Sequence, residues 1–149
     1  MSIRGIEDIA LSHIRNNVLP GMGWAIDGND YGLLVDLARN EWKRAVVAAT
    51  PGGSELQDEV QAELDIHRYV PDAYCIYGFE NRRLLVWIEV ADTNPLSRDK
   101  LFGLSELWFF FDCIGTWSLA VLSFDRFGTT PTLVPMRTIF YAQDGVAKP

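Results

Sequence analysis

Two apolar strand-like segments separated by one helical segment constrain the fold of this chain more than any other feature. The first runs from Arg83 to Ala91, and the second runs from Trp117 to Phe124. Between them, Asn94-Pro95-Leu96-Ser97 stops the first strand and caps a helix that reaches about Asp112. The second segment is almost continuously apolar, which is typical of a strand buried on both faces. This order predicts a right-handed crossover to a parallel neighbouring strand.

Another β-rich segment, Pro71 to Tyr77, precedes the strand that begins at Arg83. The two are expected to form an antiparallel hairpin through Gly78 to Arg82. If the two strands pair symmetrically about the midpoint between Glu80 and Asn81, Asp72 lies opposite Glu89. Directly opposed carboxylates destabilise a strand pair, and an unpaired carboxylate in an apolar strand is costly. A cation between them removes both objections, and Mg²⁺ is commonly held by one or two carboxylates.

Helical patterns precede the hairpin. Thr50-Pro51-Gly52-Gly53 breaks the chain, and Ser54-x-x-Gln57 fits a capping box, so a helix is expected from about Glu55. Its buried stripe is Leu56, Val60 and Leu64, and the acidic stripe beside it is Glu55, Glu59 and Glu63. A solvated face is the ordinary interpretation of that acidic stripe.

The ends of the chain are simpler. Ile6, Ile9, Ala10 and Ile14 recur at helical spacing, and a second helix is expected from about Tyr31 to Val47. A last β-rich segment, Thr132 to Tyr141, contains Pro135 and suits a sheet edge or a bulge. We therefore expect a single domain with a helical N-terminal extension (1–53), an α/β core (54–126) and a C-terminal strand and tail (127–149).

Composition limits the function classes. With 149 residues and 48% hydrophobic residues, the chain can bury one sizeable core. The net charge of −7 gives no general attraction for nucleic acid or for an anionic membrane, and the excess acid lies between residues 54 and 112. Cys75 and Cys113 lie in apolar sequence without metal spacing, so both are expected as buried thiols. The Cys113–Phe124 stretch is too short to cross a bilayer, so we expect a cytoplasmic protein that does not partner a membrane.

Pro71-Asp72, then Ile88-Glu89-Val90-Ala91 at the end of an apolar strand, then a helix and a buried strand resemble the PD-(D/E)xK nuclease superfamily. The resemblance covers roughly residues 54–126 and rests mostly on the order of the elements. It implies a restriction-endonuclease-like core, which is a mixed sheet flanked by helices. It also implies a divalent metal, Mg²⁺ or Mn²⁺, held by the Asp and the Glu.

Carried over by position, the resemblance makes Asp72 and Glu89 the metal carboxylates. Glu59, with Glu63 as the alternative, corresponds to the acidic residue of the preceding helix. The motif lysine is missing, because Ala91 stands two residues after Glu89. Lys100 in the first turn of the next helix is the candidate catalytic substitute, and an ordinary exposed helix residue is the other interpretation of Lys100.

Two functional hypotheses follow, and a third, weaker interpretation is a metal-free protein of helices and a sheet in which the pairing of Asp72 with Glu89 is fortuitous. The first is a metal-dependent nuclease that hydrolyses phosphodiester bonds of DNA or RNA. The second is a catalytically degenerate nuclease-like fold that acts as a protein-interaction or inhibitory module, with a protein partner or a second copy of the chain. The missing lysine and the aromatic run Leu107-Trp108-Phe109-Phe110-Phe111 favour the second.

Overall fold

A mixed sheet forms the centre of the protein. The computed structural model describes residues 12–13, 16–17, 20, 34–36, 41–90, 97–124 and 131–134. In these residues the spatial order of the strands follows the chain: β1 (Leu34–Asp36), β2 (Ala73–Phe79), β3 (Arg82–Val90), β4 (Trp117–Phe124) and β5 (Pro131–Leu133). Only the pairing of β3 with β4 is parallel, and the other three pairings are antiparallel.

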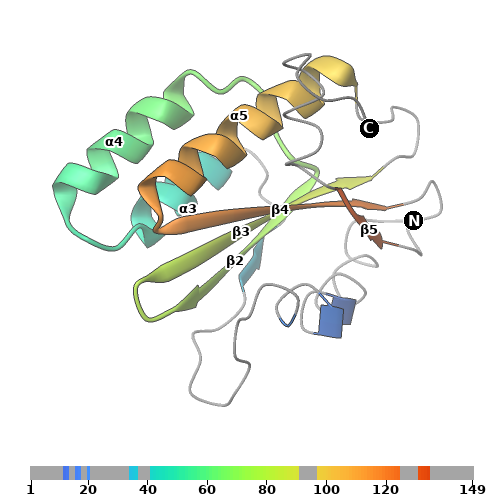
Figure 1. Cartoon of the computed structure of the whole chain (residues 1–149), viewed down its shortest axis with the longest axis horizontal. Coiled ribbons are helices and arrows are strands. Elements are labelled where there is room, and N and C mark those ends of the chain that lie inside the picture. The colour runs from blue at the N-terminus through green and yellow to red at the C-terminus, as the bar shows by residue number, and fades with distance from the viewer. Residues whose placement is uncertain are drawn as a thin grey trace.

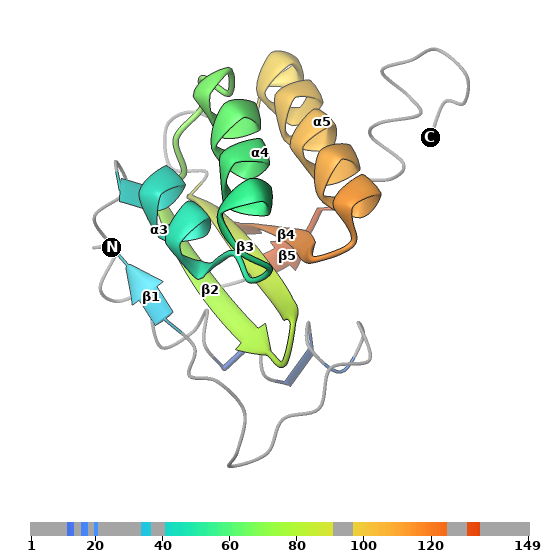
Figure 2. The ribbon, with the colours of Figure 1, turned by 90° about the vertical axis from the view of Figure 1, so that its left-hand side faces the viewer.

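Three described helices cover one face of this sheet (Figures 1 and 2). They are α3 (Trp42–Ala49), α4 (Ser54–Asp65) and α5 (Arg98–Ile114). The expected α/β class, with a mixed sheet and helices, is confirmed. The order of helix, hairpin, helix and parallel strand is also confirmed, since α5 connects β3 to its parallel neighbour β4.

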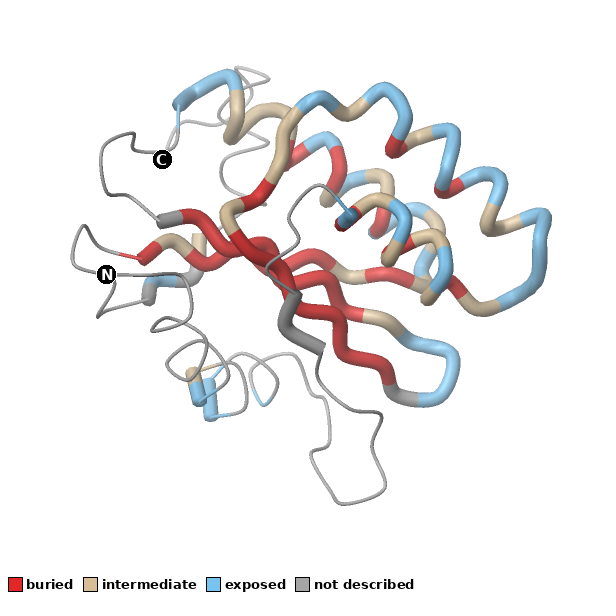
Figure 3. Tube along the Cα trace, turned by 180° about the vertical axis from the view of Figure 1, so that it is seen from behind, coloured by how far each residue is buried: buried red, intermediate tan, exposed pale blue. Residues whose placement is uncertain are grey.

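The core lies between the helices and the sheet, and strands β2, β3 and β4 are buried along most of their length (Figure 3). Leu104, Leu107 and Phe111 form the buried side of α5, while Leu101 and Trp108 flank it and are partly buried. The ring of Phe111 stacks on Trp117, with 5.5 Å between centroids. The Trp117 indole also donates to Thr50 Oγ1 at 2.9 Å, which ties the end of α3 to the start of β4.

The expected hairpin register is confirmed. Ala73 pairs with Ile88 and Phe79 pairs with Arg82, so the strands are symmetric about the midpoint between Glu80 and Asn81. The turn is tighter than expected, because the strands continue until only Glu80 and Asn81 are left between them. Glu80 adopts φ = 53°, in the left-handed region that two-residue hairpin turns require.

Two local expectations are wrong. Residues 34–36 form β1 instead of the start of a Tyr31–Val47 helix, because their backbone pairs with residues 74–76 of β2. That long-range pairing overrides the helical spacing of the apolar residues. The capping box is also absent: Gly53 is the N-cap of α4, and the Gln57 side chain donates instead to the Thr50 carbonyl at 3.3 Å.

The cysteines differ from each other. Cys75 is buried in β2 as expected, but Cys113 is exposed, because it lies away from the buried side of α5. The expected helix through Ile6 and Ile14 lies outside the described residues, as does the expected C-terminal strand beyond residue 134. The described part of this C-terminal segment is strand β5, which spans Pro131–Leu133.

A pair of phenylalanines on α5 tests this packing. Phe111 is fully buried and Phe109 is 48% exposed. We expect Phe111→Ala to lower the free energy of unfolding by about 3–5 kcal/mol, as deletion of a buried ring usually does. Phe109→Ala should cost less than about 1 kcal/mol. Urea denaturation of both variants measures the difference, and equal losses would contradict the described orientation of α5.

Candidate functional site

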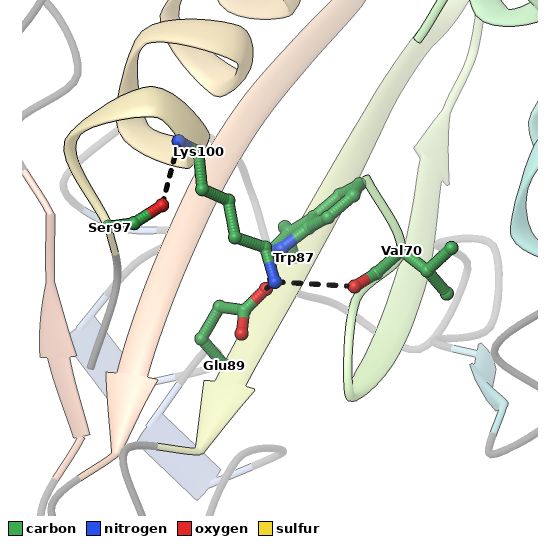
Figure 4. A network of polar contacts seen from close by, with 5 residues as sticks. All are labelled: Val70, Trp87, Glu89, Ser97 and Lys100. Carbon is green, nitrogen blue, oxygen red and sulfur yellow. Dashed lines mark hydrogen bonds and ion pairs between the residues drawn. The ribbon is translucent and has the colours of Figure 1, made fainter. Parts of the chain in front are cut away.

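A buried carboxylate marks the end of the central strand β3. Glu89 is 7% exposed, although the other buried residues of β3 are hydrophobic. Its Oε1 accepts a hydrogen bond from Trp87 Nε1 at 2.7 Å and lies 2.6 Å from Lys100 Nζ (Figure 4). Glu89 and Trp87 are two residues apart and therefore project on the same face of the strand. The core residues on that face pack against the helices.

Lys100 reaches this carboxylate from the first turn of α5. The helix begins after Ser97, whose Oγ accepts from the Lys100 backbone N–H at 3.1 Å. This cap fixes where the helix starts and therefore where the Lys100 side chain begins. The side chain is 22% exposed, and its Nζ also lies 3.5 Å from the Val70 carbonyl oxygen. Lys100 is thus a partly buried ion-pair partner, and its interpretation as an ordinary exposed helix residue is wrong.

Asp72 lies immediately before β2, and its backbone N–H donates to the Ile88 carbonyl at 3.0 Å. This bond places the Asp72 backbone beside the end of β3, one residue before the paired register that begins with Ala73 and Ile88. The charge of Asp72 contributes to the raised pKa of Glu89, so the two carboxylates influence each other electrostatically. The structure therefore gathers Asp72, Glu89 and Lys100 in one region.

Burial raises the pKa of Glu89 above its ordinary value. Hydrogen bonds from Lys100 and Trp87, together with the positive charge of Lys100, lower the pKa, and the charge of Asp72 raises it. Burial outweighs the two donors. The hydrogen bonds and the ion pair therefore replace only part of the hydration that the ionised Glu89 carboxylate loses on burial. Another positive charge nearby would stabilise the ionised form.

The acidic stripe of α4 does not join this region. Glu59 is exposed, whereas Glu63 is partly buried and faces Glu106 of α5, whose charge adds to burial in raising the Glu63 pKa. Within the described ranges, no three His, Cys, Asp or Glu side chains are grouped closely enough to hold a metal ion. Glu59 is thus not assembled with Asp72 and Glu89. The missing motif position, Ala91, lies outside the described residues.

Sequence reasoning missed the aromatic support behind Glu89. His67 lies against Trp87, Trp42 and Tyr69, with ring centroids 5.5–5.9 Å apart in edge-on contacts. Burial and the charges of Lys43 and Lys100 lower the His67 pKa to about 4, so the ring is neutral at pH 7. The signal for Trp87 was present, since a residue two positions before Glu89 shares its face. His67 had no such local signal, because Trp42 and Trp87, against which it packs, come from distant parts of the chain.

A cavity of about 290 Å³ opens beside this support, between the end of α4 and the start of α5. Its walls include the rings of His67, Tyr69 and Phe102, and the side chains of Glu63 and Glu106. The absence of a side chain at Gly103 leaves room for the Tyr69 ring, because a Cβ at position 103 would lie 2.7 Å from that ring.

No protein-family model matches the chain, and no curated protein or solved structure is significantly similar to it. Among the described residues, no helix combines the length and the hydropathy needed to span a membrane.

Removal of the lysine tests the ion pair. Because the folded state raises the Glu89 pKa above the ordinary value of 4.5, Glu89 costs stability as pH rises from that value through the folded pKa. Lys100→Met removes two influences that lower this pKa, so the loss should grow and extend to higher pH. We expect roughly 3 kcal/mol of destabilisation at pH 7, at the low end for a broken buried pair, and a smaller effect at pH 4.

Urea denaturation at both pH values measures this effect. Arg98→Met, at an exposed position of the same helix turn, is the matched control and should change the free energy of unfolding by less than about 0.5 kcal/mol. An equal loss at pH 4 and pH 7 for Lys100→Met would show that ionised Glu89 does not depend on the lysine.

Proposed function

We propose that this protein is a metal-dependent nuclease of the PD-(D/E)xK type, with a restriction-endonuclease-like core, which hydrolyses phosphodiester bonds of DNA or RNA. One observation carries the proposal: Lys100 Nζ lies 2.6 Å from Glu89 Oε1, and the charge of Asp72 acts on the same carboxylate. These are the three chemical groups that the nuclease motif requires. The lysine comes from the following helix instead of from the strand.

The donor chemistry of the two carboxylates fits a divalent cation. Mg²⁺ prefers carboxylate oxygens and completes its shell with waters and substrate phosphate, so Asp72 and Glu89 suffice as protein ligands. When bound, such an ion would activate a water and stabilise the charge that develops on the phosphate. The raised pKa of Glu89 favours this role, because a buried carboxylate lacking full compensation gains from a nearby cation.

The protein's own groups divide the remaining tasks. Trp87 donates to Glu89 and holds its carboxylate in one orientation. Lys100 brings a positive charge to the place where a phosphate would lie. Arg68 and Arg98 are exposed nearby in the chain and are available to contact a nucleic-acid backbone. Arg82 and Arg83 lie at the other end of β3, and Arg83 donates to the carbonyls of Ala49 and Glu80, so neither belongs to this region.

The first test removes one carboxylate at a time. With Mg²⁺ or Mn²⁺ present, we expect the wild type to cut labelled DNA or RNA, and chelation by EDTA to stop it. Asp72→Asn and Glu89→Gln should each lower the rate at least about 100-fold while the circular dichroism spectrum stays unchanged, since each removes a metal ligand. Glu55→Gln on the exposed first turn of α4 is the control. Undiminished cleavage by either carboxylate variant would exclude this site as the catalytic centre.

The second test concerns the migrated lysine. Lys100→Met should lower the cleavage rate about 10–1000-fold while Mn²⁺ binding, followed by calorimetry, is retained. Lys100→Arg keeps the charge and should recover part of the rate if the group acts on a phosphate. If Lys100→Met cuts as fast as the wild type, the lysine serves only to compensate Glu89.

A second candidate function rests on a different observation. Lys100 already forms an ion pair with Glu89, and among the described residues two large hydrophobic side chains are exposed: Ile66 at 77% and Phe109 at 48%. A degenerate nuclease-like module that binds another protein would show these features. Absence of cleavage by the wild type, with either metal and on single- and double-stranded DNA and RNA, would favour this second function.

A further inference from the structure

The cavity between α4 and α5 is separate from the region that contains Asp72, Glu89 and Lys100, which we call the carboxylate region, and the proposed cleavage chemistry does not use it. Its volume of about 290 Å³ lies at the small end for ligand sites and suits one small planar group rather than an extended chain. It adjoins the carboxylate region through the chain itself: Tyr69 lines the cavity, and the next residue, Val70, contacts Lys100 through its carbonyl oxygen.

Aromatic rings form part of the cavity wall. His67, Tyr69 and Phe102 contribute them, and the neutral His67 ring adds an aromatic surface without a positive charge. The guanidinium of Arg68 lies over the Tyr69 ring, 5.0 Å from its centroid, and donates to the Tyr69 hydroxyl at 2.9 Å. Such surfaces bind nucleobases by stacking, which is worth about 1–3 kcal/mol per base.

The polar groups on the two helices are acceptors. Glu63 lines the cavity from α4, and Asp99 and Glu106 line it from α5, while Arg68 of the connecting segment is the one cationic residue of the lining. Within the described chain, neither glutamate has a cation within ion-pair distance. Carboxylates there repel a phosphate but accept hydrogen bonds from an amino group. A base with an exocyclic amino group offers such donors on its Watson–Crick edge, whereas uracil presents a carbonyl oxygen at the corresponding position.

We propose that this cavity is a nucleobase pocket that accepts an unpaired base carrying an exocyclic amino group, such as cytosine, next to the carboxylate region. The inference rests on the proposed nuclease function and adds to it a substrate class: single-stranded or locally opened nucleic acid. The phosphate would lie toward Lys100 and the base between α4 and α5. A stacked, paired base could not enter such a pocket.

Cytidine and uridine provide a matched pair of probes, because they are nearly equal in size and differ at the edge that the carboxylates would contact. Both are titrated into the 149-residue chain without metal, and binding is followed by NMR chemical-shift changes. We expect cytidine to bind about tenfold more tightly than uridine. Glu106→Gln adds an amide donor, so it should reduce or reverse that preference. Glu55→Gln should leave the preference unchanged.

Equal binding of the two nucleosides, or binding of neither, would overturn the pocket assignment. So would binding of butylammonium in place of cytidine, which would identify a pocket for organic cations. The nuclease proposal is judged separately by cleavage. If oligocytidine and oligouridine are cut equally and no nucleoside binds, the nuclease stands without the pocket. If cytidine binds and no substrate is cut with either metal, the pocket stands without the nuclease.

Discussion

The parallel pairing of β3 with β4 determines most of what surrounds it. Parallel neighbours cannot be joined by a tight turn, so the chain must travel back along the sheet before β4 begins. The 17 residues of α5 span about 25 Å as a helix, close to the roughly 26 Å of the eight-residue strand β4. The helix therefore starts near the end of β3. As a consequence, Lys100 in its first turn lies within reach of Glu89.

The same geometry exposes an energetic cost. A carboxylate on the helix-facing side of a central strand loses most of its water, and the Trp87 and Lys100 donors compensate only part of that loss. A hydrophobic residue at position 89 would stabilise the sheet at least as well, since buried ion pairs seldom exceed apolar packing. Retention of a charge in such a place is understandable if the charge has chemistry to perform, which is the premise of the proposed function.

Sequence patterns predicted those parts of the molecule in which local and long-range signals agree. The hairpin register follows from the symmetry of two β-rich segments, and the parallel strand follows from the helix that precedes it. Leu34 to Asp36 were assigned wrongly because a free strand edge far along the chain decides their conformation. Capping of α4 was assigned wrongly because Gly53 competes with Ser54 as the N-cap.

The candidate site shows the same division. Asp72 and Glu89 could be brought together from pairing arithmetic, and Lys100 from its place in the first helical turn. Glu59 was expected beside them from the family resemblance, but it lies on the exposed side of α4, as its spacing in the acidic stripe indicated. The cavity could not be predicted, because its walls combine two helices and a connecting segment whose relative positions depend on packing.

The outer strands of the sheet carry a consequence for self-association. In the part of the chain that the structure describes, β1 pairs with three residues of β2, and β5 pairs with three residues of β4. Long, flat edges recruit further strands and lead to aggregation, whereas very short edge strands offer few backbone groups to a second chain. β5 also begins with Pro131, which has no N–H to donate. The two described edges of this apolar sheet are therefore poor templates for fibril growth. The longer strands between them, β2, β3 and β4, would be good templates if they became exposed.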